Sequence, residues 1–273
     1  MSRRIKEAWN KLIFCWNISD SVSAFFTLIV NTKRYKWNKV KSQNHVKIND
    51  TPVKYALRFN NKKRTIFLRT YAGDLDIFYE IFYKKAYAFS FSKNAEMIMD
   101  AGANIGLATI YFLNQFPDCK VISVEPDPTN IEVFKKNLAE EIKKQKIFLV
   151  EGAIGLTDGF AFMSSAVLKY NSKILEDQKS FVEKIDVKVI SMNNFFKQYS
   201  IDKIDILKID IEGSEIQLFT DDVKWLERVK EIVMEVHSAR AYHVCTKALL
   251  DYNFIRKNFF NESFPQIGFW VKK

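Results

Sequence analysis

Two glycines, four positions apart, follow a short apolar run that ends in a carboxylate. The run closes at Asp100, Gly102 and Gly106 come next, and apolar residues at helical spacing begin at Leu107. This pattern is typical of a strand that enters a helix through a glycine loop. Glycine lets the backbone approach a ligand closely, and the unpaired N–H groups of a helix start bind polar or anionic groups. The stretch therefore predicts a binding site of the nucleotide type.

The residues of this loop exclude one class of nucleotide. A dinucleotide fingerprint that starts at Gly102 needs glycine at positions 104 and 107, where the chain has Asn104 and Leu107. Glu125 lies 23 residues beyond Gly102 and follows the mostly apolar run 121–124. A carboxylate at the end of the second strand suits the two hydroxyls of a ribose. An adenosine-bearing ligand without a diphosphate fits both observations, and S-adenosylmethionine is such a ligand.

Four segments, as an ordered set, resemble the FkbM-type methyltransferases. They are Asp100-Ala-Gly-Ala-Asn-Ile-Gly106, Glu125-Pro126, Leu207-Lys-Ile-Asp-Ile-Glu-Gly213 and Val233-Met-Glu-Val-His237, and the resemblance covers residues 66–255. It implies a class I methyltransferase fold and O-methylation, often of sugar hydroxyls in polysaccharide, glycolipid or natural-product pathways. In this fold the tip of the third strand lies against the adenine. The expected cofactor contacts are Asp100, Gly102, Ala103, Asn104, Gly106, Glu125, Pro126, Ala153, Ile154 and Asp210.

Methyl transfer needs alignment of acceptor, methyl group and sulfur, and a base for the acceptor's proton. Asp210, Glu212 and His237 end adjacent predicted strands, at the sheet edge where ligands bind. We expect His237 to be the base, because a histidine titrates near neutrality, with Asp210 or Glu212 orienting its ring and the acceptor hydroxyl. Lys208, inside an apolar strand, is a further site candidate. A purely structural role for His237 remains the alternative.

The same acidic pair beside a histidine has the composition of a divalent cation site. Three convergent ligands are not established by the spacing of Asp210, Glu212 and His237. We therefore expect S-adenosylmethionine as the cofactor and no metal.

The strand and helix patterns predict an α/β protein: a Rossmann-like doubly wound, mostly parallel sheet with a C-terminal antiparallel hairpin, behind a basic N-terminal helical and hairpin extension. The expected boundaries are a basic extension over 1–50 and a methyltransferase domain over 51–273. Within the domain, 51–92 form an N-terminal cover and 93–273 the core. The expected strands are 97–100, 121–124, 147–150, 204–209, 231–236, 254–260 and 266–271.

The cover begins with two alternating runs, 53–59 and 64–70, that predict a hairpin. A helix follows over 74–83, with Asp74 as its N-cap. In the resembling family an element like this covers the cofactor end of the sheet. Three tyrosines are either lining residues of that cover or plain core residues: Tyr71, Tyr83 and Tyr87.

Two interpretations fit residues 164–184, which lack a firm period and are rich in Ser and Lys. They are a surface loop or a lid that binds the acceptor. Just before them, Thr157-Asp158-Gly159 predicts the turn of a hairpin that runs into 160–163.

The N-terminal extension carries the positive charge. Residues 1–64 hold 15 Lys/Arg against 3 Asp/Glu, whereas the other 209 residues hold 27 against 29. An apolar stripe at helical spacing starts at Ile5 and ends at Trp16, and 31–50 are a predicted linker. Two interpretations fit this stripe. It packs on the domain or on a second copy in a homo-oligomer, or residues 1–30 bind a membrane surface peripherally.

Partners and compartment follow from composition. The nearly neutral core argues against nucleic acid around the site. The resemblance to the FkbM-type methyltransferases implies a sugar or glycan as the acceptor. The three cysteines, Cys15, Cys119 and Cys245, have no metal spacing, which indicates a reducing compartment. No apolar run reaches the roughly 18 residues of a membrane span. We expect a cytoplasmic protein, free or at the cytoplasmic face of the membrane.

Three other function classes are weighed against this prediction. A nicotinamide-dependent sugar oxidoreductase needs the glycines that the loop lacks. A non-catalytic module with a retained fold is disfavoured by intact Glu125, Asp210, Glu212 and His237. A protein or nucleic-acid methyltransferase is the third. Its base-flipping versions usually end the fourth strand in a polar-Pro-Pro-aromatic motif, where this chain reads Asp210-Ile-Glu-Gly213.

Overall fold

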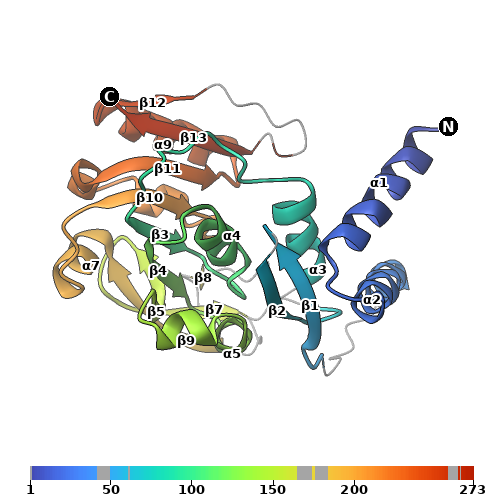
Figure 1. The fold of residues 1–273 in the computed structure, drawn as a ribbon. Coiled ribbons are helices and arrows are strands. Elements are labelled where there is room, and N and C mark those ends of the chain that lie inside the picture. The colour runs from blue at the N-terminus through green and yellow to red at the C-terminus, as the bar shows by residue number, and fades with distance from the viewer. Residues whose placement is uncertain are drawn as a thin grey trace.

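The computed structural model describes residues 2–41, 50–60, 62–164, 174–175, 184–257, 264 and 266–273. A seven-stranded sheet, in the order β12-β13-β11-β10-β3-β4-β5, forms its centre (Figure 1). The parallel strands are β3 (Met97–Ala101), β4 (Lys120–Glu125), β5 (Ile147–Glu151), β10 (Ile204–Ile209) and β11 (Val229–Glu235). The antiparallel strands β12 (Phe254–Arg256) and β13 (Ile267–Lys272) complete one edge. The predicted doubly wound α/β fold is confirmed.

Helices cover both faces of this sheet, because its central strands are apolar on both sides. Successive residues alternate between two cores: Ile98 and Ile206 belong to one cluster, and Met99 and Leu207 to the other. The first cluster includes residues of α4 (Leu107–Gln115) and α5 (Pro128–Asn137), and the second includes residues of α7 (Met192–Gln198) and α9 (Ala239–Asp251). Three short helices complete the core: α6 (Ala139–Lys143), α8 (Glu215–Leu218) and the 3-10 helix η3 (Lys224–Arg228).

A second, four-stranded sheet follows β5. Its order is β6-β9-β7-β8, with β6 (Ala153–Gly155), β7 (Gly159–Ser164), β8 (Ile174–Leu175) and β9 (Lys184–Ser191). The prediction of a hairpin at 157–159 is wrong, because β9 lies between β6 and β7 and pairs with both. Most of the segment 164–184, for which a loop or lid was expected, lies outside the described residues.

The cover consists of a hairpin and a bent helix. The hairpin prediction is confirmed: β1 (Val53–Phe59) and β2 (Lys62–Leu68) pair antiparallel. Helix α3 (Asp74–Phe78) continues into η1 (Tyr79–Tyr83), a turn of π-helix. Asp74 is not the N-cap, which is Gly73 in the left-handed region. The Asp74 carboxylate is fully buried and instead accepts hydrogen bonds from the backbone and side chain of Arg69.

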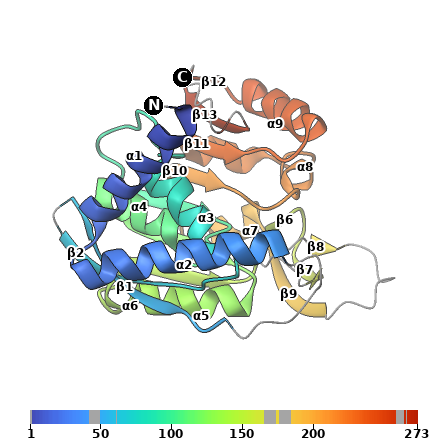
Figure 2. The same ribbon diagram turned by 90° about the vertical axis from the view of Figure 1, so that its right-hand side faces the viewer.

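Two N-terminal helices, α1 (Arg3–Ile18) and α2 (Val22–Lys41), pack against this cover on one side of the molecule (Figures 1 and 2). The linker prediction for 31–50 is wrong over 31–41, which are helical, and 42–49 lie outside the described residues. The interpretation in which the stripe from Ile5 to Trp16 packs on the domain is also wrong. Cys15 and Ile18 on the opposite face of α1 are the buried residues. In the described part of the chain, no helix has the length and apolar character needed to cross a bilayer.

The N-terminal helices share a core with the sheet. Cys15 and Leu28 belong to the same buried cluster as Tyr55 of the hairpin and Ile98 of β3. The division into an extension and a domain at residue 50 thus runs through one hydrophobic cluster.

Candidate functional site

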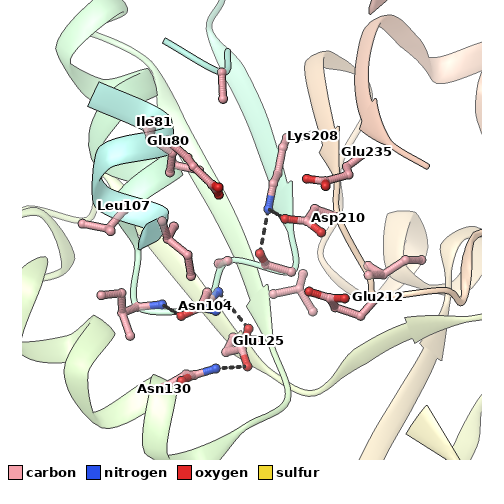
Figure 3. A pocket seen from close by; sticks show the side chains of 18 of the residues that line it. Glu80, Ile81, Asn104, Leu107, Glu125, Asn130, Lys208, Asp210, Glu212 and Glu235 are labelled. Atoms are coloured by element: carbon pink, nitrogen blue, oxygen red, sulfur yellow. Dashed lines mark hydrogen bonds and ion pairs between the residues drawn. The ribbon is translucent and has the colours of Figure 1, made fainter. Parts of the chain in front are cut away.

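A cavity of about 360 Å³ opens at the carboxyl edge of β3, β4, β10 and β11 (Figure 3). Parallel strands place the residues that follow them at this edge, where ligands of such sheets bind. Most of the residues predicted from the sequence line the cavity. They are Gly102, Ala103, Asn104, Glu125, Pro126, Ala153, Ile154, Lys208, Asp210, Glu212 and His237. Asp100 and Gly106 are not among the residues that line it.

The glycine loop is shaped by the chain's own packing. Gly102 has φ +82°, and a Cβ there would lie 1.8 Å from the carbonyl oxygen of Asp210. Gly106 has φ +86°, and a Cβ there would lie 2.5 Å from Leu138. Both positions therefore require glycine before any ligand is considered. Asn104, between them, adopts φ +50°, and its side-chain oxygen accepts from the N–H of Ile105.

Glu125 presents a buried carboxylate to the cavity. Its Oε2 accepts from the N–H of Asn104 (2.8 Å), and its Oε1 accepts from the N–H of Asp127 (2.9 Å) and from Asn130 Nδ2 (3.1 Å). Burial raises the pKa of Glu125 to about 7, although these hydrogen bonds act to lower it. Asp127 also caps α5 through the N–H of Thr129, as its sequence position before Pro128 predicts. The loop and the α5 start are thus tied together through one carboxylate.

Lys208 crosses beneath the loop and fixes its position. Its buried Nζ donates to the carbonyl of Gly102 (2.7 Å) and lies 3.1 Å from Asp100 Oδ1 and 3.6 Å from Asp210 Oδ2. Burial lowers the pKa of Lys208, but the nearby negative groups, Asp100 foremost, raise it by more, so the ammonium is charged. Asp100 is fully buried and also accepts from Thr109. Lys208 therefore holds the loop by its hydrogen bond to Gly102, and its ion pair with Asp100 holds Lys208 in place.

His237 lies between a buried carboxylate and two carboxylates at the cavity. Its Nδ1 is 2.8 Å from Oε1 of Glu215, and its Nε2 is 3.5 Å from Glu212 and 3.8 Å from Asp210. Burial lowers the pKa of His237, but the hydrogen bond and charge of Glu215, followed by Asp210 and Glu212, raise it to about 9. The closest carboxylate is thus Glu215, which the sequence analysis did not select. Asp210 and Glu212, the expected orienting groups, lie farther from the ring.

Three carboxylates line the cavity beside His237: Asp210, Glu212 and Glu235. Burial and the charge of Asp210 raise the pKa of Glu212 to about 7, and the same two causes raise the pKa of Glu235 to about 7. Glu235 accepts from Gln266 Nε2 (3.2 Å), and Glu212 has the left-handed φ of +51°. At neutral pH Glu212 and Glu235 are therefore partly protonated, so each can accept or donate a hydrogen bond.

The sequence was compared with known proteins. The sequence model of the methyltransferase FkbM domain matches residues 100–270, more than half of the chain and all of the sheet edge described above. The chain belongs to the FkbM methyltransferase family. It is therefore a methyltransferase of the class I fold, as the resemblance of its motifs predicted.

Two curated relatives of this FkbM chain are similar over most of their length. Methyltransferase sdnD of Sordaria araneosa is 26% identical over 206 residues, which cover 64% of this chain and 79% of that protein. Methyltransferase 1 of Beauveria bassiana (strain ARSEF 2860) is 24% identical over 192 residues, with coverages of 63% and 77%. Among solved structures, methyltransferase FkbM of Methylobacillus flagellatus KT is 16% identical with a TM-score of 0.49. The match covers 71% of this chain and 47% of that one, so this chain spans about half of its length.

The FkbM site also contains residues of the cover. Ile77, Glu80 and Ile81 line the cavity from α3 and η1, and Tyr87 lines it from the segment after η1 (Figure 3). Of the three candidate tyrosines, Tyr87 alone is among the residues that line this cavity. Glu80 could have been found from its helical spacing to Ile77, three residues before it. The signal for Glu215 is weaker, since it lies in a four-residue helix directly after the motif that ends at Gly213.

One group of side chains in this FkbM site has the ligand types of a metal centre. One ligand atom each from Asp210, Glu212 and His237 lies within 4.8 Å of the others. The mixed nitrogen and oxygen donors suit a divalent cation. The raised pKa of His237 opposes this use, because an imidazole must lose its proton to coordinate.

Proposed function

We propose that this protein transfers a methyl group from S-adenosylmethionine to a hydroxyl of a sugar, within a polysaccharide, glycolipid or natural product. The observation that carries the proposal is that one cavity joins two unlike ends. One end has the buried Glu125 carboxylate beside the glycine loop, and the other has the Glu212–His237 group. The first end suits a ribose and the second suits proton transfer from a hydroxyl.

The residues of the cavity fit the proposed cofactor. The Glu125 carboxylate accepts hydrogen bonds from the two hydroxyls of a ribose, since its two oxygens match a vicinal diol. Ala153 and Ile154 are buried in β6, directly after β5, and supply an apolar contact for a flat purine. When bound, the sulfonium cofactor supplies an activated methyl group. The chain's task is then to position the acceptor in line and to exclude water.

His237 is the proposed base. Its Nε2 faces the cavity carboxylates, while Glu215 holds Nδ1 and thereby fixes the ring. The imidazole accepts the hydroxyl proton only in its neutral form, so its pKa of about 9 makes turnover rise with pH. Glu212, with a pKa of about 7, is the competing base, and the two assignments predict pH profiles that differ by about two units.

A sugar acceptor is supported by the three carboxylates that line the cavity beside His237. Asp210, Glu212 and Glu235 present several acceptor oxygens within one cavity, which suits an acceptor with several neighbouring hydroxyls. The same negative groups disfavour a phosphate backbone in this part of the cavity, consistent with an acceptor other than nucleic acid.

The experiment is methyl transfer from labelled S-adenosylmethionine to a panel of nucleotide sugars, oligosaccharides, glycolipids, RNA and protein. We expect label in a sugar fraction, and we expect His237→Ala to lower turnover while S-adenosylhomocysteine still binds. Label in RNA or protein would refute the acceptor class. Binding of NAD but not of S-adenosylhomocysteine would refute the cofactor.

A further inference from the structure

Helix α1 exposes its apolar stripe to solvent. Five apolar residues of α1 follow helical spacing, and each is between 39% and 59% exposed: Ile5, Trp9, Leu12, Ile13 and Trp16. The helix is held to the molecule by its other face, where Cys15 is fully buried and Phe14 contacts the rings of the cover. The stripe is therefore not buried by the packing of α1 on the molecule. An exposed apolar surface of this kind marks a site of interaction.

The exposed surface continues onto α2. Val22, Phe26 and Val30 recur every fourth residue and are 56%, 58% and 43% exposed. An aromatic contact joins the two helices, since the ring centroids of Trp16 on α1 and Phe25 on α2 lie 5.3 Å apart. The ring centroid of Phe25 is also 5.3 Å from that of the exposed Phe26. Figure 2 shows α1 and α2 together on one side of the molecule. We refer to the exposed residues of the α1 stripe with Val22, Phe26 and Val30 as the outer face.

The charge of these helices selects a class of partner. Residues 1–41 contain nine Lys/Arg and two Asp/Glu, whereas residues 65–273 contain 27 and 29. Lys6, Lys33 and Arg34 are exposed along the same two helices. An amphipathic helix with basic side chains and exposed tryptophan is the pattern that binds in the plane of an anionic bilayer.

A second copy of the chain is a poorer partner for this surface. Pairing two outer faces would bring together two segments of the same positive charge, which repel one another. Anionic headgroups instead neutralise the lysines and arginines, while tryptophan is well placed at the level of the headgroups. We propose that the outer face binds the surface of an anionic membrane, with α1 and α2 lying in the interface.

The two helices that carry the outer face pack directly against the cover of the cofactor site. On one side of α3 and η1, Phe14 packs against Phe78 and Tyr79, and Thr32 Oγ1 is 2.8 Å from the Tyr79 hydroxyl. On the other side, Ile77 and Glu80 line the cavity. The helices α1 and α2, and behind them the cover, thus lie between the proposed membrane surface and the candidate active site. The proposal concerns binding and does not depend on which group the protein methylates.

Tryptophan fluorescence gives a direct test on the full chain. Trp9, Trp16 and Trp37, all on the two N-terminal helices, are exposed, whereas Trp225 and Trp270 are buried at 1% exposure. We expect the emission to shift to shorter wavelength, and to be quenched by brominated lipid, when vesicles of phosphatidylethanolamine and phosphatidylglycerol are added. Vesicles of phosphatidylcholine alone should have little effect. Flotation of the protein with the same vesicles measures the bound fraction.

Matched variants separate the outer face from the rest of the surface. Trp9→Ser with Trp16→Ser should reduce flotation at least about tenfold, because two large apolar side chains no longer enter the interface. Leu250→Ser, at an equally exposed apolar residue of α9, should float like the parent protein. Lys6→Glu with Lys33→Glu should also reduce flotation, whereas Lys143→Glu with Lys144→Glu should not. Unchanged S-adenosylhomocysteine binding in each variant would show that the fold is intact.

Three results would overturn the proposal. The parent protein fails to float with anionic vesicles, the Trp9→Ser/Trp16→Ser variant floats as well as the parent, or light scattering finds a stable dimer that this variant converts to monomer. The last result would assign the outer face to a second copy of the chain.

Discussion

Glu215 holds the ring of His237 from the interior of the protein: its Oε1 lies 2.8 Å from Nδ1, and its side chain is fully buried. The same oxygen accepts from the N–H of Gly213 (3.0 Å), so the turn after β10 and the histidine after β11 share one anchor. This contact directs Nε2 towards Asp210 and Glu212. Orientation by a buried carboxylate is a common way to fix a histidine for proton transfer.

Replacing this anchor should change the pH profile. His237 has a folded pKa of about 9, above the ordinary 6.5, so the parent's kcat/KM should rise with pH up to about 9. Glu215→Gln removes the main group that raises the pKa, and the rising limb should move to lower pH by about one unit or more. We expect kcat/KM to fall about 10- to 100-fold as the ring loses its orientation. A limb near pH 7 in both proteins would identify Glu212 as the base.

Glu125→Gln should weaken cofactor binding. A charge-assisted hydrogen bond contributes about 1.5–3 kcal/mol, so the affinity for S-adenosylhomocysteine should fall about 10- to 100-fold in calorimetric titration. Glu151→Gln is the matched control, because Glu151 is the register partner of Glu125 on β5 and its side chain is 55% exposed. Equal losses in the two variants would contradict the role of Glu125.

Glu125 should also make the stability of the ligand-free protein depend on pH. Its folded pKa, about 7, is above the ordinary 4.5, so its contribution is complete below about pH 4.5 and is lost as pH rises to about 7. A shift of this size corresponds to about 3 kcal/mol. In urea unfolding, the parent should lose about that much more stability than Glu125→Gln between pH 4.5 and 7. Parallel pH curves would show that burial does not raise this pKa.

Lys208→Met should destabilise the fold as well as the loop. It leaves Asp100 buried without its cation, which costs about 3–5 kcal/mol. The control is Lys230→Met: Lys230 lies 2.7 Å from Asp205 but is 56% exposed, so its loss should cost under about 1 kcal/mol. Chemical denaturation measures both. If the two variants unfold alike, Lys208 does not hold the loop in the way described.

Chelation should leave turnover unchanged. Although Asp210, Glu212 and His237 lie close enough to hold an ion, the imidazole is protonated below pH about 9 and Lys208 already neutralises part of the site. Methyl transfer measured before and after EDTA treatment checks this. Activity that disappears on chelation and returns with magnesium would assign the three side chains to a metal.

The central sheet could be predicted because its signals are local. Apolar runs ending in Asp100, Glu125, Asp210 and His237 gave both the strands and the cavity edge. Glu215 was missed because its importance depends on a long-range contact to His237, 22 residues away. Asp74 was misassigned because it follows the sequence rule for a cap, whereas the buried guanidinium of Arg69 competes for its carboxylate.

Helix α2 was missed over 31–41 for a different reason. Its buried face there includes polar residues: Asn31 donates to the Tyr55 hydroxyl (2.8 Å), and Thr32 bonds Tyr79. Hydrophobic periodicity cannot detect a helix face that is satisfied by hydrogen bonds. On α1 the periodicity was detected correctly, but it belongs to the solvent-exposed face.

The cluster that joins Cys15, Leu28 and Tyr55 to Ile98 has a consequence for how this enzyme can be rearranged. A fragment that starts at residue 100, where the matched family domain begins, would expose to water the members of this cluster that the first 99 residues cover. Transplanting that domain into another scaffold should therefore yield aggregates unless the first 99 residues travel with it.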